Sequence, residues 1–346
     1  MKNTPIPVRP ARPATDASAI ERAAFANFAA ASGRMGTGDA VAILARLYPD
    51  DRRAAAVLNR AAVDPGTTGG WGASVLQNVV TDFFGSLNAE SAVASLMGAG
   101  LMVPLDLGGG ISIPHRPAGP VTAPWVGEGD PIPVRQGAFA AAAMEPAKKL
   151  ATITTFTGEL SRRTAAEAIF RRVLREDAGL ALDSAYFSAE AGTADGLAGL
   201  LYGVTPVSPS GSTLKEDLAD LAGAVSANGS GQVAFVMSPK RAARAAILEP
   251  DYRSVILASR AISDTRIIGL DPASLAHGFD GQPDITASRE AVIHMSNDPD
   301  PISDGGVSDP VRSAFQTDAL FLRLIVDASF CKVRSDAVAY IEGASW

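Results

Sequence analysis

The spacing of apolar residues predicts one long helix in the middle of the chain. Between Ala165 and Glu190 apolar residues recur every three or four positions, which is the period of a helix with one buried face. Thr164 and Glu167 form a capping box at its start. At about 1.5 Å per residue this helix is on the order of 39 Å long, so we expect it to span a flat, elongated domain.

The segment after residue 210 predicts a second group of elements. Thr213 and Glu216 form another capping box, and an amphipathic helix follows it. Its apolar face consists of Leu214, Leu218, Leu221 and Val225. Val233–Met237 has the length and composition of a short buried strand, and further strand-like runs lie at 265–269 and 291–295.

Strict alternation predicts a long strand from residue 320 onward, because successive side chains of a strand point to opposite faces. One face carries Leu320, Leu322, Leu324 and Val326, and the other carries Phe321, Arg323, Ile325 and Asp327. We expect at least one of these faces to be buried.

Residues 103–157 carry a different signal, because prolines interrupt any helical period throughout. They are Pro104, Pro114, Pro117, Pro120, Pro124, Pro131, Pro133 and Pro146. The runs Ile111–Ile113 and Ala151–Phe156 favour extended backbone. So long a stretch without helix is uncommon in a compact domain and usually serves a function or a partner. We interpret it as a loop that contacts another subunit.

The first 65 residues predict short, alanine-rich helices. Asp16 and Asp39 are candidate N-caps, and the run after Asp16 carries Ile20, Phe25 and Phe28. Helices with so few large apolar residues gain little from burial. We therefore expect this segment to be peripheral to the folded subunit.

A linker at 64–70 (DPGTTGG) separates this segment from the next one. Between Trp71 and Met102 the apolar residues again have helical spacing, which ends at Gly98 and Gly100. We expect a helix here that leads into an extended strand.

Composition narrows the classes of function. The chain has 47% apolar residues and a formal net charge of −7, whereas a protein that coats DNA needs clustered Lys and Arg. Cys331 is the only cysteine, which excludes an intramolecular disulfide. No run reaches the roughly 18 apolar residues of a membrane span, and no apolar signal segment follows the first residues. We expect a protein that works where it is made, away from membranes.

None of the common catalytic motifs occurs in the sequence: there is no phosphate-binding loop, dinucleotide fingerprint, H-E-x-x-H zinc motif or nucleophile elbow. His115, His277 and His294 lie far apart, which favours structural roles. Cys331 ends an apolar strand, where a free cysteine is usually a small buried side chain. The acidic run 298–304 lacks the spacing of a calcium loop and predicts a solvated turn. We therefore predict no catalytic residue, no cofactor and no metal site.

One stretch, Trp125 to Leu160, carries a recognisable series of residues. A Trp-x-x-Glu-Gly turn is followed by a proline, a phenylalanine, a Pro-x-Lys-Lys-Leu-Ala strand and a Thr-Gly-Glu-Leu entry to a helix. The matching residues are Trp125, Glu128, Gly129, Pro133, Phe139, Pro146, Lys148, Lys149, Leu150, Ala151, Thr157, Glu159 and Leu160. In this order they resemble the major capsid proteins of tailed bacteriophages, which share the Hong Kong ninety-seven fold.

The resemblance implies an α+β fold built of several parts. These are an N-terminal helical extension and linker (1–70), an N-terminal arm (71–115), an extended E-loop (116–156), a peripheral domain with a long spine helix (157–204 and 291–335) and an axial domain (205–290 and 336–346). In many relatives an N-terminal portion acts as an internal scaffold or is removed by a prohead protease, and residues 1–65 are its counterpart in position.

The resemblance also implies a structural role without catalysis or cofactor. Subunits of this family form hexamers and pentamers of an icosahedral shell, which encloses double-stranded DNA without reading its sequence. The E-loop residues expected at contacts between subunits are Trp125, Glu128, Gly129, Phe139, Lys148 and Lys149. Further expected partners are a portal, a prohead protease, and scaffold or decoration proteins. The expected location is the virion, after assembly in the cytoplasm of the bacterial host.

Two other functions stay open on the sequence alone. An encapsulin-like nanocompartment uses the same shell geometry around an enzyme cargo, and the packaged content, DNA or protein, distinguishes the two. The other is a hydrolase without a recognised motif. Particle size in the electron microscope separates such an enzyme from a shell protein.

Overall fold

The computed structural model describes residues 18–32, 39–58, 87, 90–103, 105, 110–116, 125–129, 132, 139–161, 166–211, 213–227, 229–294, 296 and 311–346. Several expected features lie outside these ranges. They are the Asp16 cap, the linker at 64–70, most of the helix expected after Trp71, Thr164 of the first capping box and the acidic run 298–304.

The first sheet is built around one long central strand. Its order is β1 (Leu101–Met102), β8 (Leu275–Ser288), β11 (Ala319–Lys332) and β4 (Lys148–Thr157). β11 pairs antiparallel with both β4 and β8, and the short β1 is parallel to β8. β11 is the strand expected from the alternating pattern, and its predicted apolar face is buried.

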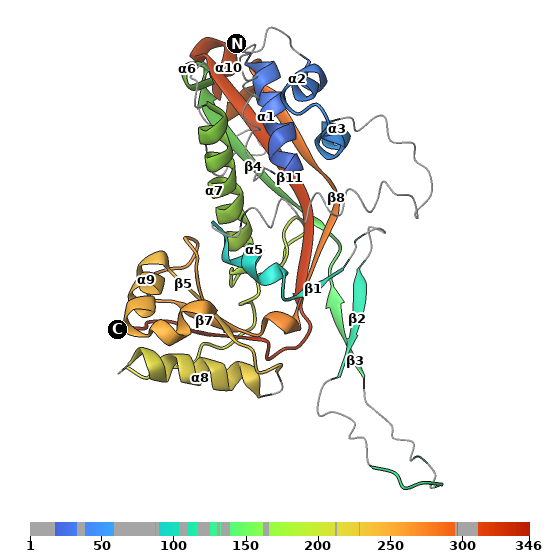
Figure 1. Ribbon diagram of the computed structural model, residues 1–346. Helices are drawn as coiled ribbons and strands as arrows, with labels where there is room; N and C mark the ends of the chain where they lie inside the picture. Colours follow the sequence, from blue (N-terminus) through green and yellow to red (C-terminus); the bar gives the residue numbers. More distant parts are fainter. Residues whose placement is uncertain are drawn as a thin grey trace, which may run out of the picture.

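The long helix expected from the sequence is α7 (Ala166–Tyr186), which ends at Tyr186 and not at Glu190. It packs against β4 and buries Phe170, Leu174 and Leu182. Figure 1 shows α7 beside α1 over the first sheet. We call the first sheet with its helices the long unit.

The N-terminal helices are α1 (Ala19–Ala31), α2 (Ala40–Leu47) and α3 (Arg52–Leu58). Asp39 caps α2 as expected, whereas the cap of α1 is Ser18 and not Asp16. The expectation that this segment is peripheral is wrong for the described residues. Ile20, Phe25 and Phe28 are almost completely buried, in the same apolar cluster as residues of the first sheet and α7.

The reason is the size of alanine. The α1 alanines at 19, 23, 24, 26 and 29 are buried too, because a small side chain lets a helix approach a sheet closely. The two phenylalanines then reach Phe156 of β4 and Phe170 of α7, with ring centroids 4.8 to 6.1 Å apart in the closest pairs. A count of large apolar residues therefore underestimated how much α1 buries.

The second sheet is smaller and has the order β12 (Val338–Ile341), β7 (Ile267–Leu270), β5 (Ala234–Met237) and β6 (Ile256–Ala258). α8 (Leu214–Ser226) packs on β12 and β7, and α9 (Pro239–Leu248) packs on β5 and β6. Thr213 caps α8 as the capping box predicted, since its side chain accepts a hydrogen bond from the Glu216 amide. We call this sheet with α8, α9 and the 3₁₀ helix η1 (Pro250–Val255) the end unit.

The border between the two units differs from the expected one. The expected axial domain ran to residue 290, but β8 pairs with β11 along most of its length and belongs to the first sheet. The chain leaves the second sheet after β7 and crosses through the short 3₁₀ helix η2 (Pro272–Ser274). The pairing of β8 with β11 determines to which sheet β8 belongs. The local sequence pattern of 275–288 does not predict this pairing.

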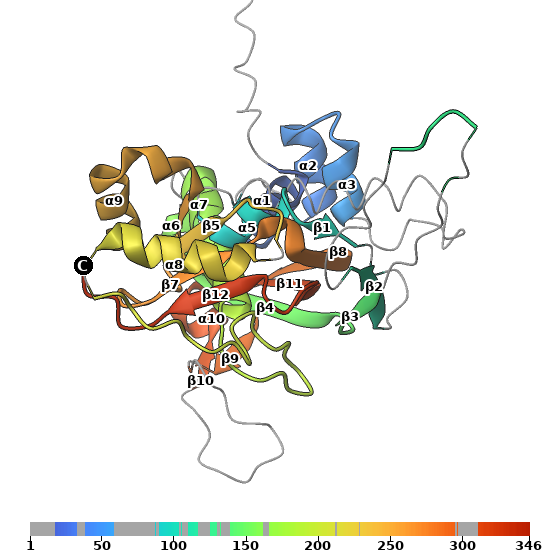
Figure 2. The same ribbon diagram turned by 90° about the horizontal axis from the view of Figure 1, so that it is seen from below.

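The remaining elements extend from this frame. α5 (Ala92–Met97) leads into β1, as expected for the segment that ends at Gly98, and α6 (Gly158–Ser161) follows β4. β2 (Ile111–His115) and β3 (Ala140–Met144) pair as a hairpin. β9 (Val292–His294), β10 (Val311–Ser313) and α10 (Ala314–Thr317) form a second projection, which Figure 2 shows below the first sheet. The mixed helix and sheet architecture agrees with the expected α+β class.

Candidate functional site

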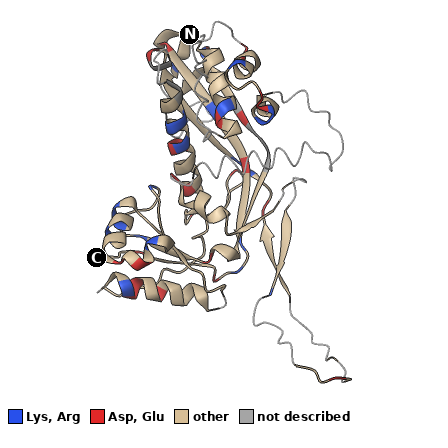
Figure 3. Cartoon of the chain, in the orientation of Figure 1, with Lys and Arg blue, Asp and Glu red and all other residues tan. Residues whose placement is uncertain are grey.

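The hairpin of β2 and β3 extends away from both units (Figure 1). Its strands, ISIPH and AAAAM, carry no Lys, Arg, Asp or Glu, and Figure 3 shows them free of charge colours. Large apolar side chains in the described chain beyond the strands face water: Trp125 is fully exposed, Ile132 is 80% exposed and Phe139 is 69% exposed. Large apolar side chains that are exposed to water are candidates for contact with another protein.

Two local features shape this region. Gly129 has φ +87°, a left-handed conformation that favours glycine, so it makes the turn that the Glu-Gly pair predicted. The Arg116 guanidinium lies 5.4 Å from the centroid of the Phe139 ring, which places a cation over the ring where the two strands end and the loop between them begins. Glu128 is exposed beside Gly129.

Lys148 and Lys149 do not lie in the hairpin but in β4 of the first sheet. Lys148 Nζ donates a hydrogen bond to the Ala194 carbonyl at 2.5 Å. This lysine therefore joins β4 to the segment that follows α7 in the same subunit. Lys149 is exposed and stands opposite Asp327 in the register of β4 and β11. The structure therefore separates these two residues from the other four expected contact residues.

A buried carboxylate lies where the two units meet. Asp183 of α7 is 0% exposed and accepts hydrogen bonds from Ser91 Oγ (2.5 Å), the amides of Ala92 and Val93 (both 3.1 Å) and Ser259 Oγ (2.5 Å). Burial raises the pKa of Asp183 above its usual value, although all of these hydrogen bonds oppose that change.

This cluster was not predicted from the sequence. An acidic residue on the apolar face of the expected helix was the only local signal for Asp183, because Ser259 lies far away in the sequence.

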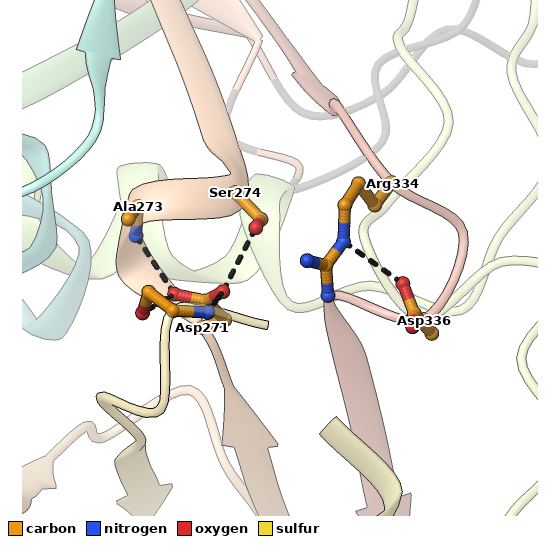
Figure 4. A network of polar contacts seen from close by, with 6 residues as sticks. Asp271, Ala273, Ser274, Arg334 and Asp336 are labelled. Carbon is orange, nitrogen blue, oxygen red and sulfur yellow. Dashed lines mark hydrogen bonds and ion pairs between the residues drawn. The ribbon is translucent and has the colours of Figure 1, made fainter. Parts of the chain in front are cut away.

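A second polar cluster lies at the chain crossing of η2. Asp271 accepts hydrogen bonds from Ser230, from the Ala273 amide at 3.1 Å and from Ser274 Oγ at 2.8 Å. Figure 4 shows the contacts of Asp271 with Ala273 and Ser274 beside the ion pair of Arg334 and Asp336. Burial alone raises the pKa of Asp271, but the hydrogen bonds outweigh it and hold that pKa below the usual value. The ionised carboxylate of Asp271 thus fixes the crossing through the hydrogen bonds that it accepts.

The histidines and the cysteine lie apart from both clusters. His277 of β8 is buried, and neither of its ring nitrogens has a hydrogen-bond partner among the described residues. Its ring stacks on Tyr186 with the centroids 5.8 Å apart, while His294 is exposed on β9. Burial raises the pKa of Cys331 to about 11, so its thiol stays protonated at neutral pH. Within the described residues, no three or more His, Cys, Asp or Glu side chains gather where they could hold a metal ion.

One open cavity of about 720 Å³ lies between α5 and the end unit. Leu96 of α5 and Ala99 just after it line one side, and the end unit contributes Leu218, Ala222 and Leu257. Among the described helices, none combines the length and the apolar character that crossing a bilayer needs.

Comparison with known proteins gives the class of this chain. The model of the phage capsid family matches residues 72–251, which is more than half of the chain. The chain therefore belongs to the phage capsid family, and its role is that of a structural subunit of a phage capsid. This match does not favour the nanocompartment alternative. No curated protein matches the sequence.

Solved structures similar to this chain include several phage particles. One from Microbacterium phage Oxtober96 has 16% identity and a TM-score of 0.48, covering 73% of this chain and 91% of that one. The capsid of an empty GTA particle has 14% identity, a TM-score of 0.46 and coverage of 85% and 99%. The procapsid of satellite phage P4 with its size determination protein has 9% identity, a TM-score of 0.49 and coverage of 84% and 95%.

Proposed function

We propose that this chain forms the icosahedral shell of a tailed phage head of the Hong Kong ninety-seven type, as hexamers and pentamers around double-stranded DNA, without catalysis. In this proposal the long unit is the peripheral domain with α7 as its spine helix. The end unit is the axial domain, and the β2–β3 hairpin is the base of the E-loop. The exposed apolar side chains between β2 and β3 carry the proposal, together with membership of the phage capsid family.

The hairpin region supports a contact between subunits because it exposes large apolar side chains to water. Trp125, Ile132 and Phe139 expose large apolar surfaces on a segment whose strands have no charged residue. Covering an exposed tryptophan on a neighbouring subunit stabilises the contact by roughly 2 kcal/mol. Trp125 is therefore the anchor of the proposed contact.

The two lysines take different parts in this proposal. Lys149 is exposed on β4, which is an edge strand of the first sheet, so a neighbouring subunit can reach it. Lys148 is engaged with Ala194 of its own chain and acts within the subunit. The portal, prohead protease, scaffold and decoration proteins named above, the virion location and assembly in the host cytoplasm belong to the same proposal.

Replacing Trp125 with alanine tests the proposed contact. We expect Trp125→Ala to raise the concentration needed for assembly roughly tenfold or more, since about 2 kcal/mol is lost at each contact. The free energy of unfolding of the unassembled subunit changes by less than about 0.5 kcal/mol, because the side chain is fully exposed there. Light scattering against protein concentration measures the first quantity, and urea unfolding measures the second.

Trp125→Phe is the matched variant, because it keeps an aromatic anchor and restores most of the assembly. Normal shells from Trp125→Ala at the wild-type concentration contradict the anchor role. A subunit that unfolds on this substitution places Trp125 in a core instead.

A further inference from the structure

The turn after β6 joins the end unit to the long unit through two neighbouring residues. Ser259 is buried, and its hydroxyl donates to Asp183 of α7 at 2.5 Å. Arg260 is 56% exposed and forms ion pairs with Glu176 of α7 (3.6 Å) and with Glu90 just before α5 (3.7 Å). The contact thus has a buried part and a water-exposed part.

Asp183 serves the two units at once. Its other donors, Ser91 and the amides of Ala92 and Val93, all belong to the start of α5 in the long unit. A carboxylate has about four acceptor positions, and the two units together fill them. Figure 1 shows α5 beside the end of α7 and next to the end unit.

The other connections between the units do not define their angle in the same way. The apolar core runs continuously from the first sheet to residues of the second, such as Val236 and Ile268. Apolar contact is non-directional, so it holds the units together without a bond of fixed direction. Hydrogen bonds to a fixed carboxylate are directional.

The surroundings also leave room for movement. The open cavity of about 720 Å³ separates α5 from α8 and β6 of the end unit. The Asp271 cluster holds the chain crossing at η2 in place, and we assign this crossing the role of the pivot. Arg260 can exchange its ion pairs for water at little cost, because it is more than half exposed.

We infer that Ser259 and Arg260 form a latch on Asp183, Glu176 and Glu90. While these contacts are formed, the latch fixes the angle between the end unit and the long unit. When the contacts break, the angle is free to change. This inference rests on the proposed shell function for its consequence: neighbouring subunits contact both units, so the angle within one subunit sets the curvature of the shell.

Two serine variants separate the latch from general packing. Ser259→Ala and Ser91→Ala each remove one hydroxyl that donates to Asp183 at 2.5 Å, and both serines are buried. Only Ser259 belongs to the end unit, so Ser91→Ala is the matched control. Similar losses of thermal stability in the two variants establish that removing either hydroxyl from Asp183 destabilises the subunit to the same extent.

The angle is measured in the unassembled subunit by the distance between two spin labels. Cysteines replace the exposed Ala168 of α7 and the exposed Asp220 of α8, in a chain that also carries Cys331→Ala. We expect one narrow distribution of the label-to-label distance in the labelled chain without a serine substitution, and the same in Ser91→Ala. Ser259→Ala gives a distribution at least about twice as wide, because the open state is then populated.

An unchanged distribution in Ser259→Ala overturns the latch. Equal widening in both variants overturns it too, since packing around Asp183 is then responsible. Electron microscopy of assembled particles tests the consequence: Ser259→Ala yields more particles of abnormal diameter than Ser91→Ala, and equal yields refute the link to curvature. If the chain forms no shells at all, the proposed function fails, while the label distances still decide the latch.

Discussion

The Glu21–Arg175 ion pair fastens α1 to α7 in the core of the long unit. The Arg175 guanidinium donates from Nε to Glu21 Oε1 at 2.6 Å and from Nη2 to Oε2 at 2.8 Å, and the Glu21 side chain is fully buried. Removing one partner of a buried pair costs far more than removing an exposed pair, because a charge stays behind without its counterion.

We predict that Arg175→Met lowers the free energy of unfolding by about 3–5 kcal/mol. Arg172→Met is the matched control one turn away on α7, since Arg172 is 77% exposed in its pair with Glu176. That change has little effect on the free energy of unfolding, because water screens an exposed pair. Urea unfolding of both variants measures the difference, and equal losses contradict the role of the buried pair.

His277 makes the stability of the subunit depend on pH. Burial lowers the pKa of its imidazole from 6.5 to about 4, so the folded state binds a proton less readily than the unfolded chain does. The stabilising effect of the neutral ring is complete above pH 6.5 and is lost as the pH falls from about 6.5 to about 4. The loss amounts to roughly 3 kcal/mol over this range.

We therefore predict that His277→Met flattens the dependence of unfolding on pH between about 6.5 and 4. The measurement is urea unfolding at several pH values in this range. His294→Gln, at an exposed histidine of β9, is the control for the replacement of a histidine. If His277→Met unfolds with the same pH dependence as the natural chain, other groups are responsible.

At the scale of elements, α1 attaches the N-terminal segment to the core of the subunit. Its apolar residues lie in the main core with Phe156 and Phe170, and Arg289 also donates to the carbonyl of Ser32 just after it. These contacts differ from those expected of a removable scaffold. A helix that completes a core remains attached when the chain is cut elsewhere, because its contacts are not covalent.

We predict that a protease site inserted in the linker at 64–70 gives a cut chain whose N-terminal piece stays bound. The two pieces elute together in size-exclusion chromatography under native conditions and separate in urea. In a cut chain that also carries Phe28→Ala the pieces separate at lower urea, since that change costs about 3–5 kcal/mol. Separation of the pieces without denaturant contradicts the place of α1 in the core.

The sequence predicted those elements whose signals are local. α7, α8 and β11 follow from periodicity, and the Thr213 cap follows from a motif of adjacent residues. The sequence did not predict features that depend on distant partners. The burial of α1, the placement of β8 in the first sheet and the meeting of Asp183 with Ser259 all depend on packing or register between segments far apart in the chain.

For the molecule as a whole, the six expected contact residues fall in two places, and their contact with another subunit stays a prediction. Trp125, Glu128, Gly129 and Phe139 belong to the region of the hairpin, as the proline-rich pattern suggested. Lys148 and Lys149 belong to β4, because the pairing of β4 with β11 extends through both residues. The long unit, the end unit and the hairpin together give a subunit with surfaces that a neighbouring copy can cover.

The central claim is that copies of this chain build a closed shell, and electron microscopy of the purified, full-length protein tests it most directly. We predict closed particles made of hexamers and pentamers, in which the β2–β3 hairpin of one subunit lies on its neighbour. Micrographs that show only monomers or small oligomers, at high protein concentration and with a scaffold partner added, contradict the account.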